Sequence, residues 1–201
     1  MKQYFGTDGI RGIPNKTLSE NLVSKIFSSV EKELLPSSVA VILDTRSSSP
    51  ELLNWICRGL SENVEVINYG VLPSGSMPIL LKNFGHDLGV IISASHNPSE
   101  YNGIKLINDK GSKLSDDVEI KIEKNLEIVS LPEKPSVSKS STKGYDTYLK
   151  YLESLIDFDL SSFNILFDTA NGSSYKIIKD LFETKKSKFN IIANNPDAVS
   201  Y

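Results

Sequence analysis

The stretch Val39-Ala40-Val41-Ile42-Leu43 is a continuous apolar run with the length of one strand. An uninterrupted apolar run is typical of a strand that is covered on both faces of a sheet. Leu88-Gly89-Val90-Ile91-Ile92 has the same character, and Val64 to Ile67 predicts another strand. A fourth strand is expected from Ile104 to Ile107, after a tight turn at Asn102-Gly103.

Segments with helical periodicity separate these strands. Apolar residues at three- and four-residue spacing predict a helix from Leu18 to Leu34, which Pro36 ends. Pro50 opens a second helix, and further helices are expected around Pro78 to Phe84 and from Ser115 onward. Strands that alternate with helices predict a layered α/β/α domain with a mixed sheet.

The composition changes between residues 131 and 143, where two prolines and several serines interrupt the apolar pattern. This composition is typical of a linker. The expected organisation is a first domain over residues 1–135, a linker over 136–143, and the beginning of a second, similar α/β domain over 144–201. The second unit contains helical and strand patterns but has too few residues for a whole domain.

Bulk composition excludes several classes of protein. The 201 residues carry a net charge of -3, which lacks the basic excess of nucleic-acid-binding proteins. No apolar run approaches the roughly 20 residues that span a bilayer. The single cysteine, Cys57, excludes an internal disulfide and falls in a helical apolar pattern, which favours a buried structural thiol. We therefore expect a soluble, cytoplasmic protein with neither a nucleic-acid nor a membrane partner.

The strand Leu88–Ile92 runs directly into Ser93-Ala94-Ser95-His96-Asn97-Pro98, a loop of small and polar residues. From the residues alone, this loop is either a polar turn or a site where a large group approaches the backbone. A serine hydrolase is disfavoured, because the neighbouring side chains of Ser95 and His96 diverge and the Gly-x-Ser-x-Gly elbow is absent. Lys105 follows at a spacing that could bring its ammonium over the loop.

Three other segments carry candidate residues. Phe5-Gly6-Thr7-Asp8-Gly9-Ile10-Arg11-Gly12 combines three glycines with an arginine suited to phosphate oxygens, and is either a phosphate loop or an irregular terminal segment. Asp44-Thr45-Arg46 follows a strand and allows either an internal salt bridge or a ligand contact. Asp168-Thr169-Ala170-Asn171-Gly172 is either a turn with a helix cap or a binding segment.

Taken in order, these segments resemble the α-D-phosphohexomutase superfamily over the whole chain. Ala94-Ser95-His96-Asn97-Pro98 followed by Asn102-Gly103-Ile104-Lys105 is the most specific part of the match. The resemblance implies an isomerase that transfers a phosphoryl group within a sugar phosphate, through a phosphoserine at Ser95 and a bisphosphorylated sugar intermediate. The opening segment and Ile92-Ser93-Ala94-Ser95 are most similar to the branch that interconverts glucosamine 6-phosphate and glucosamine 1-phosphate. A phosphomannomutase/phosphoglucomutase and a non-catalytic phosphosugar-binding fragment are the alternatives.

The resemblance also implies roles for individual residues. Catalytic roles fall to Ser95, His96, Arg11 and Lys105, and contacts with substrate or phosphate fall to Thr7, Asp8, Gly9, Arg46, Asn97 and Asn102. The implied cofactor is Mg²⁺, held in part by the phosphate on Ser95. The family's metal-binding aspartates, sugar-recognition loop and carboxyl-terminal phosphate loop correspond to sequence beyond Tyr201, so we expect the 201 residues alone to be inactive. A homodimer is compatible with the resemblance.

Sequence departures weaken one part of this match. The family usually has a glycine and a basic residue before Asp-Thr-Arg, where this chain has Ile42-Leu43. Pro73-Ser74-Gly75 stands where the family commonly has Pro-Thr-Pro. The Asp44-Thr45-Arg46 turn therefore lacks the glycine and basic residue that accompany it in the family.

Overall fold

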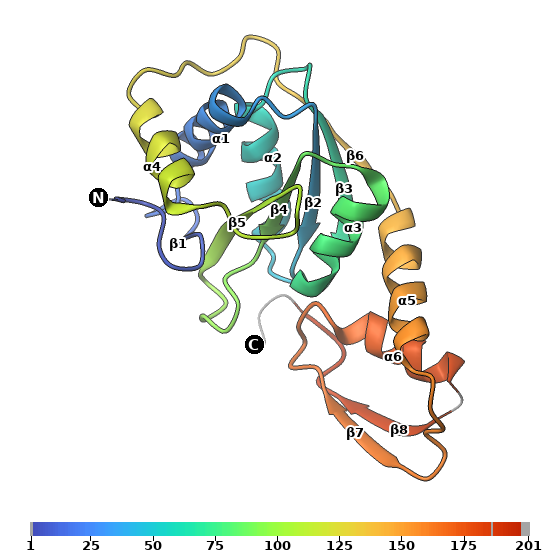
Figure 1. Ribbon diagram of the computed structural model, residues 1–201. Helices are drawn as coiled ribbons and strands as arrows, with labels where there is room; N and C mark the ends of the chain where they lie inside the picture. The colour runs from blue at the N-terminus through green and yellow to red at the C-terminus, as the bar shows by residue number, and fades with distance from the viewer. Residues whose placement is uncertain (1, 186, 198–201) are drawn as a thin grey trace.

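Six strands form a mixed sheet in the order β1-β5-β4-β2-β3-β6. The computed structural model describes residues 2–185 and 187–197 (Figure 1). β2 is parallel to β3 and β4, and β6 is parallel to β3, whereas β5 is antiparallel to both β4 and β1. The strands are Ile10–Gly12 (β1), Ser38–Leu43 (β2), Glu65–Val71 (β3), Leu88–Ile92 (β4), Asn102–Asn108 (β5) and Ser138–Ser140 (β6).

Helices cover both faces of this sheet, as Figure 1 shows. Successive side chains of a strand point to opposite faces, so β2 contributes to two cores: Val39, Val41 and Leu43 to one, Ala40 and Ile42 to the other. The layered α/β/α prediction is confirmed. The first core includes α1 (Glu20–Leu34), α2 (Ser49–Gly59) and α4 (Asp116–Asn125), and the second includes α3 (Met77–Phe84) and α5 (Lys143–Leu155).

The ends of α1 follow from local chemistry. Ser19 caps the amino end, where its hydroxyl accepts a hydrogen bond from the backbone N–H of Leu22 at 3.3 Å. Leu35 adopts a left-handed conformation (φ 50°) at the carboxyl end, directly before Pro36. The predicted end of this helix at the proline is confirmed, as is the proline at the start of α2.

At the edge of the sheet one expectation was wrong and one strand was missed. Asn102 and Gly103 do not form a turn but begin β5, where Gly103 pairs with Arg11. Strand β1 itself was not expected within the glycine-rich opening segment. A Cβ at Gly103 would lie 2.8 Å from the Ser93 carbonyl oxygen and 2.9 Å from that of Ile10, so a glycine lets three strands meet here.

The expected linker over 136–143 contains strand β6, which extends the sheet beside β3. Before it, Ser136 is buried and donates its N–H to the Leu60 carbonyl and its hydroxyl to the Val64 carbonyl, both at 2.7 Å. Polar composition therefore accompanies an ordered connection packed on the first unit. The division of the chain into domains stays a prediction.

Beyond α5, the predicted second unit (residues 144–201) contains β7 (Asn164–Asp168), α6 (Tyr175–Thr184) and β8 (Lys188–Ile192). β7 and β8 pair in parallel. Phe167 of β7 packs against Phe182 of α6, with their ring centroids 4.4 Å apart. The hydroxyl of Thr45 donates to the Asn171 carbonyl at 2.8 Å, which joins the second unit to the first. No helix in the described part of the chain is both long and apolar enough to cross a membrane.

His86 is a buried titratable group at the amino end of the sheet. Its ring is hydrogen-bonded to the Ser38 hydroxyl (2.5 Å) and to the Tyr69 hydroxyl (2.7 Å). Burial lowers the pKa of His86 below its ordinary 6.5, although the charges of Glu65 and Asp87 act in the opposite direction. The folded protein therefore favours the neutral ring more than the unfolded chain does.

This burial predicts a loss of stability in mild acid. As the pH falls, His86 in the unfolded chain takes up a proton before His86 in the folded protein does. The contribution of neutral His86 to the free energy of unfolding is therefore fully present well above pH 6.5. It falls as the pH drops from 6.5 toward the lower folded pKa. The loss is at most about 1.4 kcal/mol per pH unit. Denaturant unfolding of His86→Gln between pH 7.5 and 5 should show a shallower decline than the wild type. His96→Asn, at an exposed position, is the control and should keep the wild-type decline; parallel curves for all three proteins would contradict the prediction.

Candidate active site

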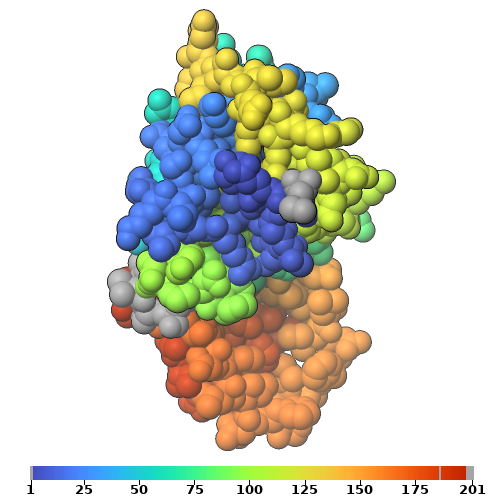
Figure 2. Space-filling model, turned by 90° about the vertical axis from the view of Figure 1, so that its left-hand side faces the viewer, coloured from blue at the N-terminus to red at the C-terminus, as the bar shows by residue number. Residues whose placement is uncertain are grey.

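Ser95 lies in an exposed loop beyond the carboxyl end of β4. Its backbone is left-handed (φ 56°), and its N–H donates to the Ser93 hydroxyl at 3.0 Å. Few residues other than glycine adopt this conformation, and such residues often occur at functional sites. Figure 2 shows the loop in light green, at the surface between the blue amino-terminal segment and the orange second unit. The loop therefore lies at the surface, where Ser95 is open to a ligand.

Arg46 fixes this loop through hydrogen bonds from its side chain to the loop backbone. Its side chain is fully buried, and its Nε–H donates to Asp44 at 3.0 Å. A guanidinium has five N–H donors, and the other four are directed at backbone carbonyls of the serine loop. These acceptors are Ser95 (2.9 Å), Asn97 (2.8 Å), Pro98 (2.7 Å) and Tyr101 (2.9 Å). The donors of Arg46 are thus directed at acceptors within the protein, and the predicted phosphate contact of Arg46 stays a prediction.

Asn102 also belongs to a buried network and not to the loop surface. Its amide nitrogen donates to the hydroxyls of Ser48 (2.9 Å) and Ser49 (3.1 Å) at the start of α2. Ser49 in turn donates to Asp44 at 2.8 Å, so the asparagine is connected to the carboxylate that pairs with Arg46. The side chain of Asn102 is fully buried, and its predicted substrate contact stays a prediction.

Asp8, Arg11 and Lys105 form a charged cluster beside the loop. Asp8 accepts hydrogen bonds from Arg11 and, at 2.6 Å, from Lys105. Burial by itself would raise the pKa of Asp8, but the hydrogen bonds and charges of Lys105 and Arg11 outweigh it and hold that pKa below its ordinary value. The cluster contains two cations and one anion and therefore carries a net positive charge. It lies near the base of the serine loop, because Arg11 pairs with Gly103 and Lys105 pairs with Ile91.

The remaining predicted residues differ in exposure. Thr7 and His96 are exposed, and Asn97 is half-buried. Gly9 is buried with φ 86°, and a Cβ there would overlap the Ile104 carbonyl oxygen and lie 3.1 Å from Lys105 Cα. Gly9 thus lets the opening segment lie against β5, which brings Asp8 to Lys105.

The salt bridge that the sequence allowed at Asp44-Thr45-Arg46 is present, whereas sequence reasoning missed Ser48, Ser49 and Ser93 as supports of the loop. A usable signal was present for two of them: Ser48-Ser49-Pro50 opens a helix directly after the Asp44-Thr45-Arg46 turn, which places helix-start hydroxyls beside a strand end. No local signal distinguishes an arginine that binds carbonyls from one that binds phosphate.

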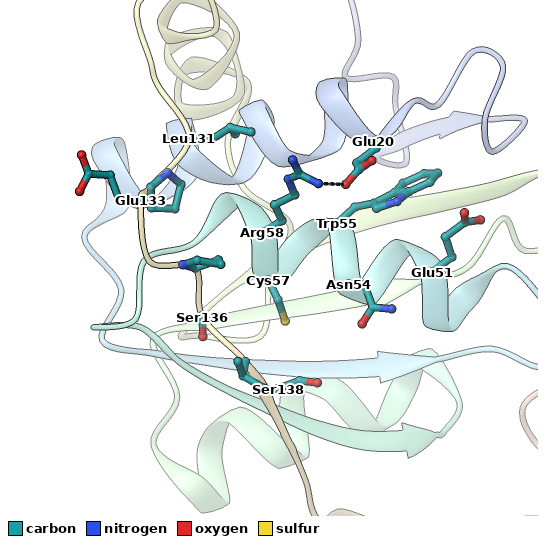
Figure 3. A pocket seen from close by; sticks show the side chains of 13 residues that line it. Glu20, Glu51, Asn54, Trp55, Cys57, Arg58, Leu131, Glu133, Ser136 and Ser138 are labelled. Carbon is teal, nitrogen blue, oxygen red and sulfur yellow. Dashed lines mark hydrogen bonds and ion pairs between the residues drawn. The ribbon is translucent and has the colours of Figure 1, made fainter.

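A cavity of about 640 Å³ lies elsewhere, between the outer face of α2 and residues 131–138 (Figure 3). It contains the ion pair of Arg58 and Glu20 (2.6 Å) and the thiol of Cys57. Burial raises the pKa of Cys57, while hydrogen bonds with Ser138 act in the opposite direction. Cys57 is only 6% exposed, which confirms the expected buried thiol. Within residues 2–185 and 187–197, no three His, Cys, Asp or Glu side chains gather into a candidate metal site.

The fold and the serine loop define a known class of protein. A family model described as "Phosphoglucomutase/phosphomannomutase, alpha/beta/alpha domain I" matches residues 2–131, and the chain belongs to this family. Among curated relatives, the phosphoglucosamine mutase of Clostridium kluyveri is 38% identical over 212 residues, which cover 100% of this chain and 47% of the relative. The phosphoglucosamine mutase of Clostridioides difficile is 36% identical over 208 residues, covering 98% and 46%. The chain thus spans about half the length of the curated relatives it matches.

Solved structures share the fold. A protein of Thermus thermophilus, provisionally assigned as a phosphomannomutase, has a TM-score of 0.85 at 19% identity and covers 99% of this chain and 48% of its own. A phosphoglucomutase/phosphomannomutase family protein of Burkholderia thailandensis has a TM-score of 0.79 at 23% identity, covering 98% and 46%. Both matches extend through the second unit.

Proposed function

We propose that this chain is part of a phosphosugar mutase that interconverts glucosamine 6-phosphate and glucosamine 1-phosphate, with Ser95 as the residue that carries the phosphoryl group. One observation carries the proposal: an exposed serine in a left-handed conformation lies on a loop that Arg46 fixes, and Arg11 and Lys105 lie on the strands at the base of that loop. The names of the relatives at 36–38% identity support glucosamine phosphate as the substrate.

Charge explains why this surrounding suits a phosphoserine. A serine phosphate carries about -1.5 to -2 charges at neutral pH. Phosphoryl transfer passes through a loose transition state whose charge is spread over the transferring oxygens, so positioning and nearby cations provide most of the rate. Arg11 and Lys105 supply those cations here, and Asp8 keeps their side chains in place. His96, Asn97 and Thr7 complete the proposed ligand surface.

The proposed cofactor is Mg²⁺, with the Ser95 phosphate as one of its ligands. Hard divalent cations of this kind bind to carboxylate and phosphate oxygens. The described residues fit this only in part, because they provide the serine but no carboxylate set around it. The other ligands in this proposal lie outside the chain, so no step of the reaction is assigned to the metal.

The wider assignments are also proposals. We assign residues 1–135 to the serine-bearing domain, 136–143 to its connection and 144–201 to the beginning of a second domain, and expect the 201 residues alone to lack turnover. A cytoplasmic location is supported by the composition. A homodimer is proposed for the complete protein, and sedimentation equilibrium would test it.

Phosphorylation of Ser95 is the direct test. We expect the complete gene product, incubated with glucose 1,6-bisphosphate, to gain one phosphate by intact-mass spectrometry. Peptide mapping should place it on Ser95, and Ser95→Ala should remove both the phosphate and the mutase turnover. Ser99→Ala is the matched control in the same loop and should keep both. Turnover in Ser95→Ala would overturn the mechanism.

Substrate choice needs a separate measurement. The complete protein should convert glucosamine phosphate with a kcat/KM above that for glucose or mannose phosphate. A preference for mannose or glucose phosphate would favour the phosphomannomutase/phosphoglucomutase alternative. Binding of a phosphosugar with no turnover and no phosphate on Ser95 would favour a non-catalytic protein.

A further inference from the structure

We propose that Arg46 is a positioning residue for phosphoryl transfer: its guanidinium sets the direction of the Ser95 side chain without touching the substrate. The inference rests on the proposed role of Ser95. Four of the five donors of Arg46 bind the carbonyls of residues 95, 97, 98 and 101, so one side chain fixes nearly the whole turn of the loop.

The contact with Ser95 itself is the decisive one. Nη2 of Arg46 donates to the Ser95 carbonyl at 2.9 Å, and the Ser95 N–H donates to the Ser93 hydroxyl at 3.0 Å. Both peptide groups that flank the Ser95 Cα are therefore restrained. Because the Cα–Cβ direction follows from these two peptide planes, they fix the bond about which the serine oxygen takes its staggered positions. The left-handed φ of 56° is sparsely populated in a free serine, so it needs such restraint.

The guanidinium is itself held in one orientation. Asp44 accepts from Nε of Arg46 through one carboxylate oxygen and from the Arg46 N–H and the Ser49 hydroxyl through the other. The positive charge is thus paired, and the side chain is fully buried, which keeps it away from an incoming phosphosugar. These contacts support a positioning role, in which Arg46 acts through the loop and not on the substrate.

A lysine cannot reproduce this arrangement. Its ammonium is a point charge with three donors, whereas the planar guanidinium directs its donors along fixed and separate lines. Arg46→Lys therefore keeps the charge beside Asp44 but loses carbonyls of the loop. A misplacement of the reacting group by about 1 Å costs on the order of 100-fold in rate.

The test uses the complete gene product and separates kcat from KM. We expect Arg46→Lys to lower kcat by about 100-fold while KM for the sugar phosphate changes less than about threefold, since the ligand surface is intact. Ser49→Ala, which removes one contact of Asp44, is the milder variant and should lower kcat by a smaller factor with KM unchanged. Arg58→Lys, in the exposed pair with Glu20, is the control and should behave as the wild type.

Chemical rescue gives a second readout. Arg46→Ala should regain part of its kcat with methylguanidinium but not with methylammonium, because only the former restores the planar donors. Wild-type kcat in folded Arg46→Lys, or a loss confined to KM, would overturn the proposal, as would equal rescue by the two cations. Should Arg46→Lys not fold, an unchanged kcat in Ser49→Ala would overturn it. Ser95→Ala is measured in the same assay to separate the role of Ser95 from the role of Arg46. Turnover in Ser95→Ala would refute the role of Ser95, independently of the results for the Arg46 variants.

Discussion

Replacing Asp44 by alanine is expected to lower the free energy of unfolding by about 3–5 kcal/mol, because it leaves a buried guanidinium without its counter-charge. The Asp44 side chain is 6% exposed and that of Arg46 is 0% exposed. The carboxylate also accepts from the Ser49 hydroxyl and the Arg46 N–H, and both donors would lose their partner. Since domains are stable by only about 5–15 kcal/mol, much of the fold's stability depends on this carboxylate.

Guanidinium chloride unfolding of the chain, followed by the fluorescence of its single tryptophan, Trp55, measures this loss. The control is Glu20→Ala, which breaks an ion pair whose side chains are 59% and 45% exposed. Exposed pairs contribute about 0–1 kcal/mol, so the two substitutions should differ several-fold. Equal losses would show that the Asp44–Arg46 pair is not buried in solution.

Gly59→Ala is expected to cost about 3 kcal/mol by overpacking the contact between α1 and α2. An added Cβ would overlap the Ser24 carbonyl oxygen and lie 2.8 Å from the Phe27 Cβ. The helices cannot simply separate, because Ser24 donates to the Trp55 carbonyl (2.9 Å) and Ser28 donates to the Gly59 carbonyl (2.8 Å). One methyl group therefore strains two interhelical hydrogen bonds.

The same unfolding measurement tests this substitution. Gly75→Ala is the matched control, since a Cβ there meets only the Tyr148 hydroxyl at an ordinary 3.5 Å. We expect it to change the free energy of unfolding by less than about 1 kcal/mol. A small effect of Gly59→Ala would mean that α1 and α2 pack less closely than described.

The hydrophobic pattern of the sequence predicted the strands that are apolar along their whole length. β2 and β4 are apolar throughout, so their sequences alone identify them. The short strands β1 and β6 and the start of β5 carry polar residues or glycine and exist because a neighbouring strand pairs with them. Such segments have no periodicity of their own, and only the three-dimensional arrangement reveals them.

For the candidate site, too, the sequence predicted some features and not others. The position of Ser95 at the end of a buried strand followed from the sequence, as did cations nearby. The parts played by Arg46 and Asn102 did not, because burial and hydrogen-bond partners come from segments about 50 residues apart. A polar residue in a motif can face the ligand or hold the loop that does, and sequence alone treats the two alike.

The antiparallel pairing of β4 with β5 has a further consequence for the serine loop. Ile92 lies opposite Ile104, and the Ser93 N–H donates to the Gly103 carbonyl at 2.9 Å, so the two ends of the loop are joined at its base. The entropy of closing the loop is therefore lost when the sheet forms and not when a ligand binds. A phosphoryl group on Ser95 would therefore move only within a small volume around the loop before it reaches its acceptor.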